Sequence, residues 1–137
     1  MKNKILFIKI IFYIGIAADF LSIFPLVFPG IAKIMFGLTN YNTSNEYLYV
    51  SRIGASLMAG WTLLLLWGSF KPIERRGILF LTLFPVLSGL LISSILTVIS
   101  ESIEFKYMLP LWIFYTVIIP LYFTAYFVAC NINSEKN

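Results

Sequence analysis

The stretch SRIGASLMAGWTLLLLWGSF, residues 51–70, decides the fold class of this chain. It is apolar over nearly its whole length and carries one charge, Arg52, near its beginning. An α-helix rises about 1.5 Å per residue, so about 20 apolar residues cover the roughly 30 Å of hydrocarbon in a bilayer. The stretch therefore predicts a transmembrane helix.

The composition of the whole chain agrees with a membrane protein. Of its 137 residues, 60% are hydrophobic and only 12% are charged, whereas a soluble domain has about 25% charged residues. The net charge of +4 comes from basic residues in short segments between apolar runs. That pattern is typical of topology signals and contact with lipid head groups, so the bilayer is the expected partner and nucleic acid is not.

Two residue counts exclude several functional classes. The chain has no histidine, which excludes His-ligated haem, the common catalytic zinc sites and any Ser-His or Cys-His nucleophile pair. It has one cysteine, Cys130, so an intrachain disulfide cannot form. We expect no metal, no cofactor and no catalytic residue of these types.

Hydropathy predicts one domain with four spans, at about residues 5–28, 48–70, 73–99 and 107–130. The first run follows a basic MKNK segment and has a cleaved secretory signal as its alternative, but its length of about 24 residues favours a span. Pro25 lies near its end, so the regular helix could stop as early as Phe24.

Two local signals complete the predicted fold. Apolar residues at helical spacing in 31–38 predict a short helix lying in the membrane interface. Pro72 is well placed in the first turn of the third helix, which predicts a tight turn after the second span. The expected fold is an all-α, integral membrane four-helix bundle.

The distribution of lysine and arginine predicts the orientation. One side of the predicted bundle holds seven of these residues: Lys2, Lys4, Lys9, Lys71, Arg75, Arg76 and Lys136. The other side holds three: Lys33, Arg52 and Lys106. The positive-inside rule then places both termini in the cytoplasm, N-in and C-in, of a multi-pass protein in the cell membrane.

Small and aromatic residues suggest which helix faces meet. In lipid, close packing of small residues decides helix contacts, so one small-residue face of the second span is predicted to turn inward. It carries Arg52, Ser56, Gly60 and Leu64, with Ala55 and Ala59 beside them. The alternative is that these small residues do not mark a contact, because Gly and Ala are common in membrane helices in general. The fourth span carries an aromatic stripe, for which plain packing is favoured over a binding surface: Trp112, Tyr115, Tyr122 and Tyr126.

The middle of the chain resembles the DoxX-like families of small four-helix membrane proteins. The resemblance lies in Arg52, in the runs GASLMAGW and LLLLW of residues 54–67, and in the basic turn KPIERR of residues 71–76. It implies a four-helix membrane fold. Those families are mostly of unknown function, with some members associated with membrane redox or stress systems, and the resemblance implies no catalytic residue.

Asp19 is the only acid in the interior of a predicted span, where an unpaired charge costs at least about 2.5 to 3.5 kcal/mol. Counting 1.5 Å per residue from the outer ends of the spans places Asp19 at roughly 8 to 14 Å depth, Arg52 at about 6 Å, and Ser93 at about 9 Å. Ser56 and Tyr115 come at about 12 Å. These five residues predict one polar, ligand-binding site that opens outward.

The alternative for this site is a protonated Asp19 bonded to Ser, Thr or Tyr, with Arg52 reaching to the head groups. Three functions remain open from the sequence. The first is binding of a small amphipathic or lipid-like ligand in the polar cavity. The second is an accessory subunit of a larger membrane complex, or a homo-oligomer, and the third is an intramembrane enzyme that uses Asp19 as acid or base.

Overall fold

The computed structural model describes residues 2–38 and 44–134, which are almost entirely helical and contain no strand. The prediction of an all-α fold is confirmed. The elements, in chain order, are α1 (Lys2–Val27), α2 (Pro29–Phe36), α3 (Asn45–Phe70), α4 (Gly77–Leu81), the π-helical turn η1 (Thr82–Leu87), α5 (Ser88–Ile99) and α6 (Phe105–Ser134).

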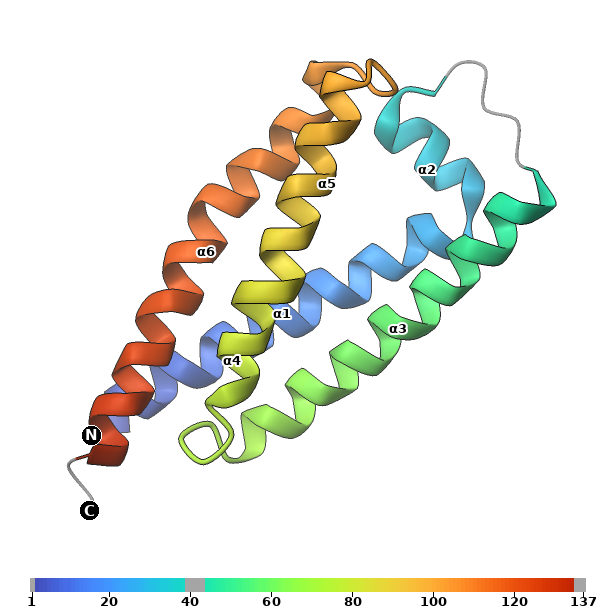
Figure 1. The fold of residues 1–137 in the computed structure, drawn as a ribbon. Helices are drawn as coiled ribbons and strands as arrows, with labels where there is room; N and C mark the ends of the chain where they lie inside the picture. Colours follow the sequence, from blue (N-terminus) through green and yellow to red (C-terminus); the bar gives the residue numbers. More distant parts are fainter. Residues whose placement is uncertain (1, 39–43, 135–137) are drawn as a thin grey trace.

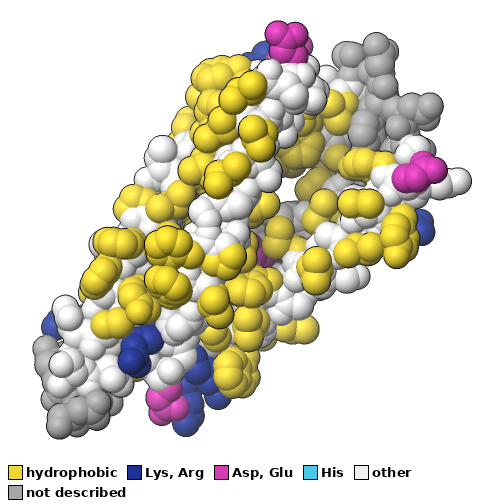
Figure 2. All heavy atoms as spheres, viewed as in Figure 1, with side chains coloured by type: hydrophobic (Ala, Val, Ile, Leu, Met, Phe, Trp, Pro, Cys, Tyr) yellow, Lys and Arg dark blue, Asp and Glu magenta, His cyan; other side chains and the backbone are white. Residues whose placement is uncertain are grey.

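Four helical stretches in the described part of the chain are long and apolar enough to span a membrane. They are Lys2–Val27, Asn45–Phe70, Gly77–Ile99 and Phe105–Ser134. Figure 2 shows hydrophobic side chains over the middle of the molecule and charged side chains gathered toward its ends. This distribution suits a protein whose sides face lipid and whose ends face water.

One helix boundary differs from the expected one. Residues 71–76 form a turn, so the third helical stretch begins at Gly77 and Pro72 does not start it. The first helix runs through Pro25 to Val27, close to its expected end at residue 28, and does not take the alternative of an early stop at Phe24. Just after Pro25, the Phe28 N–H donates a hydrogen bond of 2.8 Å to the Phe24 carbonyl, so helical bonding continues past the proline.

The four long helices alternate in direction along the bundle (Figure 1). α1 packs against both α3 and α6, and α6 also contacts α4, η1 and α5. Figure 1 shows the two ends of the chain at the same end of the bundle, here called the terminal end. This is the arrangement that the predicted four spans require.

The core is concentrated toward the terminal end. Its buried members are Ile8, Ile11, Phe12, Leu65, Ile78, Leu79, Leu83, Leu87, Tyr115, Ile118, Tyr122, Ala125, Ala129 and Ile132. They come from the first half of α1, the last part of α3, and the parts of the third and fourth spans that lie beside these. Toward the opposite end, α3 and α5 diverge (Figure 1).

The change of helix type in η1 accompanies this divergence. Pro85 lies inside η1 and has no N–H, so the regular α-helical bond at that point cannot form. The Thr82 hydroxyl donates to the Ile78 carbonyl at 2.8 Å, and Trp61 Nε1 of α3 donates to Thr82 Oγ1 at 3.3 Å. α3 is therefore joined to the third span at η1 and separates from it beyond that level.

The predicted inward face of α3 is wrong for Ser56 and Gly60, which are exposed, and right for Ala55, which is buried. Gly60 is exposed, and a Cβ built on it would meet no atom within 4 Å. The buried face instead carries Ser51 and Ala55, and Ser51 Oγ donates to the Leu26 carbonyl of α1 at 2.8 Å. The physical reason is Arg52, which shares a stripe with Gly60 and turns that stripe away from the bundle, where its charge reaches a polar environment.

The short helix predicted after the first span is present as α2. Pro29 occupies its first turn, and Gly37 ends it in the left-handed conformation with φ of 63°. In Figure 1, α2 folds back across the end of the bundle opposite the termini. Its position in a membrane interface stays a prediction.

Candidate functional site

Asp19 lies on α1 in the region where the helices begin to separate. Its side chain is half-buried, and its Oδ2 atom is fully buried with no hydrogen-bond partner among the described residues. A carboxylate without a partner in an apolar environment is strongly unfavourable, so this group is either neutral or bound by something outside the chain.

The structure does not bring Arg52 to Asp19. No ion pair joins them in the described part of the chain, and the Arg52 side chain is exposed. Ser56 is exposed too, and its hydroxyl donates to the Arg52 carbonyl one turn back on α3 at 3.0 Å. Side chains on a helix lean toward its N-terminus, which on α3 points away from the level of Asp19.

No hydrogen bond joins Ser93 or Tyr115 to Asp19 Oδ2 in the described part of the chain. Ser93 is exposed on α5, whereas its neighbour Ser94 is buried and accepts a bond of 2.9 Å from Trp112 Nε1 of α6. Tyr115 is buried in the core and lines a cavity between α5 and α6. Of the five predicted residues, Asp19 alone keeps the environment that motivated the prediction.

Tyr122 belongs to the predicted aromatic stripe, but the sequence analysis did not place it in the polar site. It exposes only 1% of its surface, and its hydroxyl, like Asp19 Oδ2, has no hydrogen-bond partner in the described structure. A Cβ on Gly15 would lie 1.9 Å from this hydroxyl oxygen, so the tyrosine approaches α1 where a side chain is missing. Gly15 is one turn before Asp19 on the same face of α1, so Tyr122 packs against α1 within one turn of Asp19.

One signal in the sequence could have led to this pair. Glycine four residues before a membrane-embedded acid leaves room on that helix face for a large side chain from another helix. Which of the aromatic residues of the fourth span fills that room depends on how α6 is rotated, and the sequence does not give this rotation.

A cavity of about 460 Å³ lies between α3 and the η1–α5 segment. Its lining residues, nearly all apolar, are Leu26, Gly54, Leu57, Met58, Trp61, Pro85, Val86, Gly89 and Leu90. Figure 2 shows the hollow between α3 and α5, with acidic atoms in its depth. Leu26 lies two helical turns after Asp19 on the same face of α1, so this face runs from the cavity to the carboxyl group.

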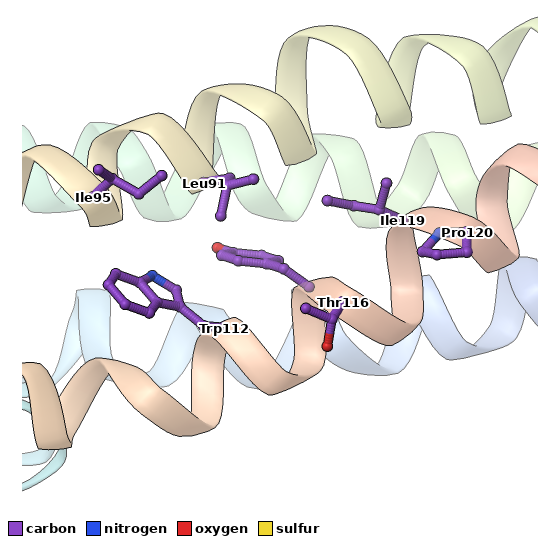
Figure 3. Close-up of a pocket in the computed structure, with 7 residues that line it drawn as sticks. Leu91, Ile95, Trp112, Thr116, Ile119 and Pro120 are labelled. Atoms are coloured by element: carbon purple, nitrogen blue, oxygen red, sulfur yellow. The ribbon is translucent and has the colours of Figure 1, made fainter.

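A second cavity, of about 570 Å³, lies between α5 and α6. Leu91 and Ile95 reach from α5 toward Trp112 on α6, and Ile119 closes the same space further along α6 (Figure 3). The bond from Trp112 to Ser94 holds the indole ring in place. Both cavities therefore have apolar walls, in contrast to the predicted polar cavity.

The described residues contain no group of three or more His, Cys, Asp or Glu side chains that could hold a metal ion. Comparison of the chain with protein-family models, with curated proteins and with solved structures finds no match. The resemblance to DoxX-like families therefore stays a prediction from the sequence.

Proposed function

We propose that this membrane protein binds a lipid-like molecule in the cavity between α3 and the η1–α5 segment. The observation that carries this proposal is an apolar cavity of about 460 Å³ on a helix face that also holds Asp19. Ligand sites are commonly apolar clefts of roughly 300 to 1,000 Å³ with a few polar groups that fix orientation. The cavity has the size and the walls for an acyl or isoprenoid chain.

Asp19 supplies the polar part of the proposed site, although it does not itself line the cavity. Its Oδ2 atom and the Tyr122 hydroxyl are fully buried, but the Asp19 side chain as a whole is only half-buried. A ligand that extends along this face of α1 can therefore reach the carboxyl group with a head that donates and accepts, such as a hydroxyl. A ligand that brings such a group gives Asp19 a hydrogen-bond partner, which removes the free-energy cost of an unpartnered acid in lipid. The proposed ligand is therefore a long apolar molecule with a small polar head.

The proposal is tested by filling the cavity from its wall. Gly89 lines the cavity, and a Cβ on it would meet no atom within 4 Å, so Gly89→Leu should fill space without a backbone clash. We expect about tenfold less copurifying lipid in mild detergent, measured by native mass spectrometry, because a side chain in the cavity competes with the ligand. The melting temperature should stay near that of the wild type.

Gly60→Leu is the matched control. Gly60 also has open space around its Cβ position, but it is exposed on α3 and does not line this cavity, so copurifying lipid should be unchanged. Equal lipid in all three proteins would contradict the proposal. A second polypeptide at fixed stoichiometry in the same spectra would instead favour the accessory-subunit function.

We further propose that both termini lie in the cytoplasm of a cell-membrane protein, as the lysine and arginine bias indicates. In a Cys130→Ser background, Ser102→Cys should react with an impermeant thiol reagent in intact cells. Ser134→Cys should react only after permeabilisation, because it lies at the terminal end of the bundle. Both positions are exposed, whereas Asn42, another loop position of interest, falls outside the described residues.

The Cys130→Ser protein without an added cysteine is the control and should not react. Reaction of Ser134→Cys in intact cells, with Ser102→Cys protected, would reverse the orientation. Reaction of both positions in intact cells would contradict the number of crossings.

A further inference from the structure

We propose that a cavity at the terminal end of the bundle binds the phosphate head group of an anionic phospholipid. The cavity measures about 370 Å³ and lies where α1, the turn of residues 71–76 and the end of α6 meet. Lys9, Lys71 and Asn133 give it polar walls, and Ile5, Phe70 and Ile73 give it apolar ones. This site is separate from the cavity between α3 and α5, so the inference does not depend on the function proposed above.

The location matches the level of lipid head groups. Basic residues gather at this end of the bundle in both the first helix and the turn before α4, namely Lys2, Lys4, Lys71, Arg75 and Arg76. Figure 2 shows lysine and arginine side chains clustered there. Clusters of such residues at a membrane surface attract anionic lipids, and a cavity among them can hold a head group.

Lys9 is the residue that most needs a counter-ion. It lies in the apolar run ILFIKIIF, is half-buried, and has no ion-pair partner among the described residues. Side chains on α1 lean toward its N-terminus, which is at this end of the bundle, so the lysine stem runs along Ile5 and its ammonium group reaches the cavity. A phosphate there would neutralise a charge that the protein leaves unpaired.

Lys71 contributes a second ammonium group, although a carboxylate shares it. Lys71 Nζ lies 3.0 Å from Glu74 Oε2, and both side chains are more than half exposed. An exposed pair of this kind contributes little stability, and an ammonium group has three N–H donors, so donors remain for a phosphate. Two lysines and one glutamate leave the lining with one net positive charge.

The two arginines of the turn are engaged elsewhere. The Arg75 guanidinium lies 3.6 Å from the centre of the Trp67 ring and donates to the Trp67 carbonyl, and Arg76 Nη1 donates to the Ile73 carbonyl at 3.1 Å. Their charges add to the local positive potential, but their contacts hold the turn in shape. The lysines are therefore the groups available to touch a phosphate.

The test is a lipid titration of the detergent-purified protein, read by native mass spectrometry. Phosphatidylglycerol and phosphatidylcholine with identical acyl chains are the probes, and the wild type should retain phosphatidylglycerol preferentially. Lys9→Gln should weaken that binding about fivefold, the factor expected for one basic side chain at an anionic surface. Lys33→Gln is the control with the same change in charge, on exposed α2 at the other end of the bundle, and should have no effect.

Glu74→Gln should act in the opposite direction. Removal of the carboxylate frees Lys71 and abolishes its repulsion of phosphate, so phosphatidylglycerol should bind about fivefold more tightly. This variant tests the site even where Lys9→Gln fails to fold. Equal retention of the two lipids, equal losses in Lys9→Gln and Lys33→Gln, or unchanged binding in Glu74→Gln would each overturn the proposal. Displacement of the lipid by inorganic phosphate at the same concentration would assign a soluble anion instead and also overturn it.

Discussion

Gly37→Ala is expected to destabilise the protein by about 2 to 4 kcal/mol through two independent effects. Gly37 has φ of 63°, a left-handed conformation that costs a residue with a Cβ roughly 1 to 2 kcal/mol. The new Cβ would also lie 2.0 Å from Cζ of Tyr107 at the start of α6. The Tyr107 ring must then move, and with it the contact that holds α2 against α6 is lost.

The melting temperature in detergent measures this loss, and Gly30→Ala is its control. Gly30 lies on the same short helix, yet a Cβ there would meet no atom within 4 Å, so its substitution should be close to neutral. In a Tyr107→Ala background, Gly37→Ala should cost only the conformational part, roughly half of the total. A full cost in that background would show that Tyr107 does not contact the end of α2.

Hydropathy made the fold class and the four spans predictable, because membrane insertion depends on the local run of apolar residues. α2 was predictable for a similar reason. The periodicity of Ile31, Ile34 and Met35 indicated a helix, and Pro29 and Gly37 mark its two ends. None of these inferences requires knowledge of how one helix packs against another.

The inward faces were not predictable in the same way. In water, an apolar stripe identifies the buried face, but in lipid both faces of a span are apolar. The sequence therefore did not distinguish Ser93 from Ser94, which differ by about 100° around the helix, or the Gly60 position from the Ala55 position, which differ by about 140°. Arg52 was the available guide, because a charged residue turns its stripe toward the polar environment.

The candidate site was predicted only in part for the same reason. Asp19 was predictable because an acidic residue inside an apolar run stands out in the sequence, whatever residues surround it in the fold. Its neighbour Tyr122 depended on the rotation of α6, and Arg52 proved to be exposed and unpaired with Asp19 in the described structure. The apolar cavity could not be predicted, since it arises from the divergence of α3 and α5 beyond η1.

Gly15→Ala is expected to produce a loss of about 2 to 3 kcal/mol, because it overpacks the contact between α1 and α6. The added Cβ would lie 1.9 Å from the Tyr122 hydroxyl oxygen, 3.1 Å from its Cζ atom and 3.3 Å from Cδ1 of Leu65. Tyr122 is nearly fully buried and Leu65 is fully buried, so neither side chain has room to withdraw.

Removal of the hydroxyl should rescue this variant. In Gly15→Ala combined with Tyr122→Phe, the closest remaining ring atom lies at the 3.1 Å position, which a shift of a few tenths of an ångström relieves. Tyr122→Phe alone should change stability little, since its hydroxyl has no hydrogen-bond partner among the described residues. A double-mutant cycle of melting temperatures should then show a coupling of about 1 to 2 kcal/mol, with the combined variant more stable than Gly15→Ala.

The cycle also tests the proposed polar site. Tyr122 reaches Asp19 only if its hydroxyl points at the Gly15 turn of α1, since the two residues on α1 lie on one face. Coupling near zero would place the hydroxyl elsewhere and would leave Asp19 without the neighbour that makes it part of a site. If the coupling is strong and Tyr122→Phe also retains less lipid, then Tyr122 serves both the contact between α1 and α6 and the binding of the ligand head.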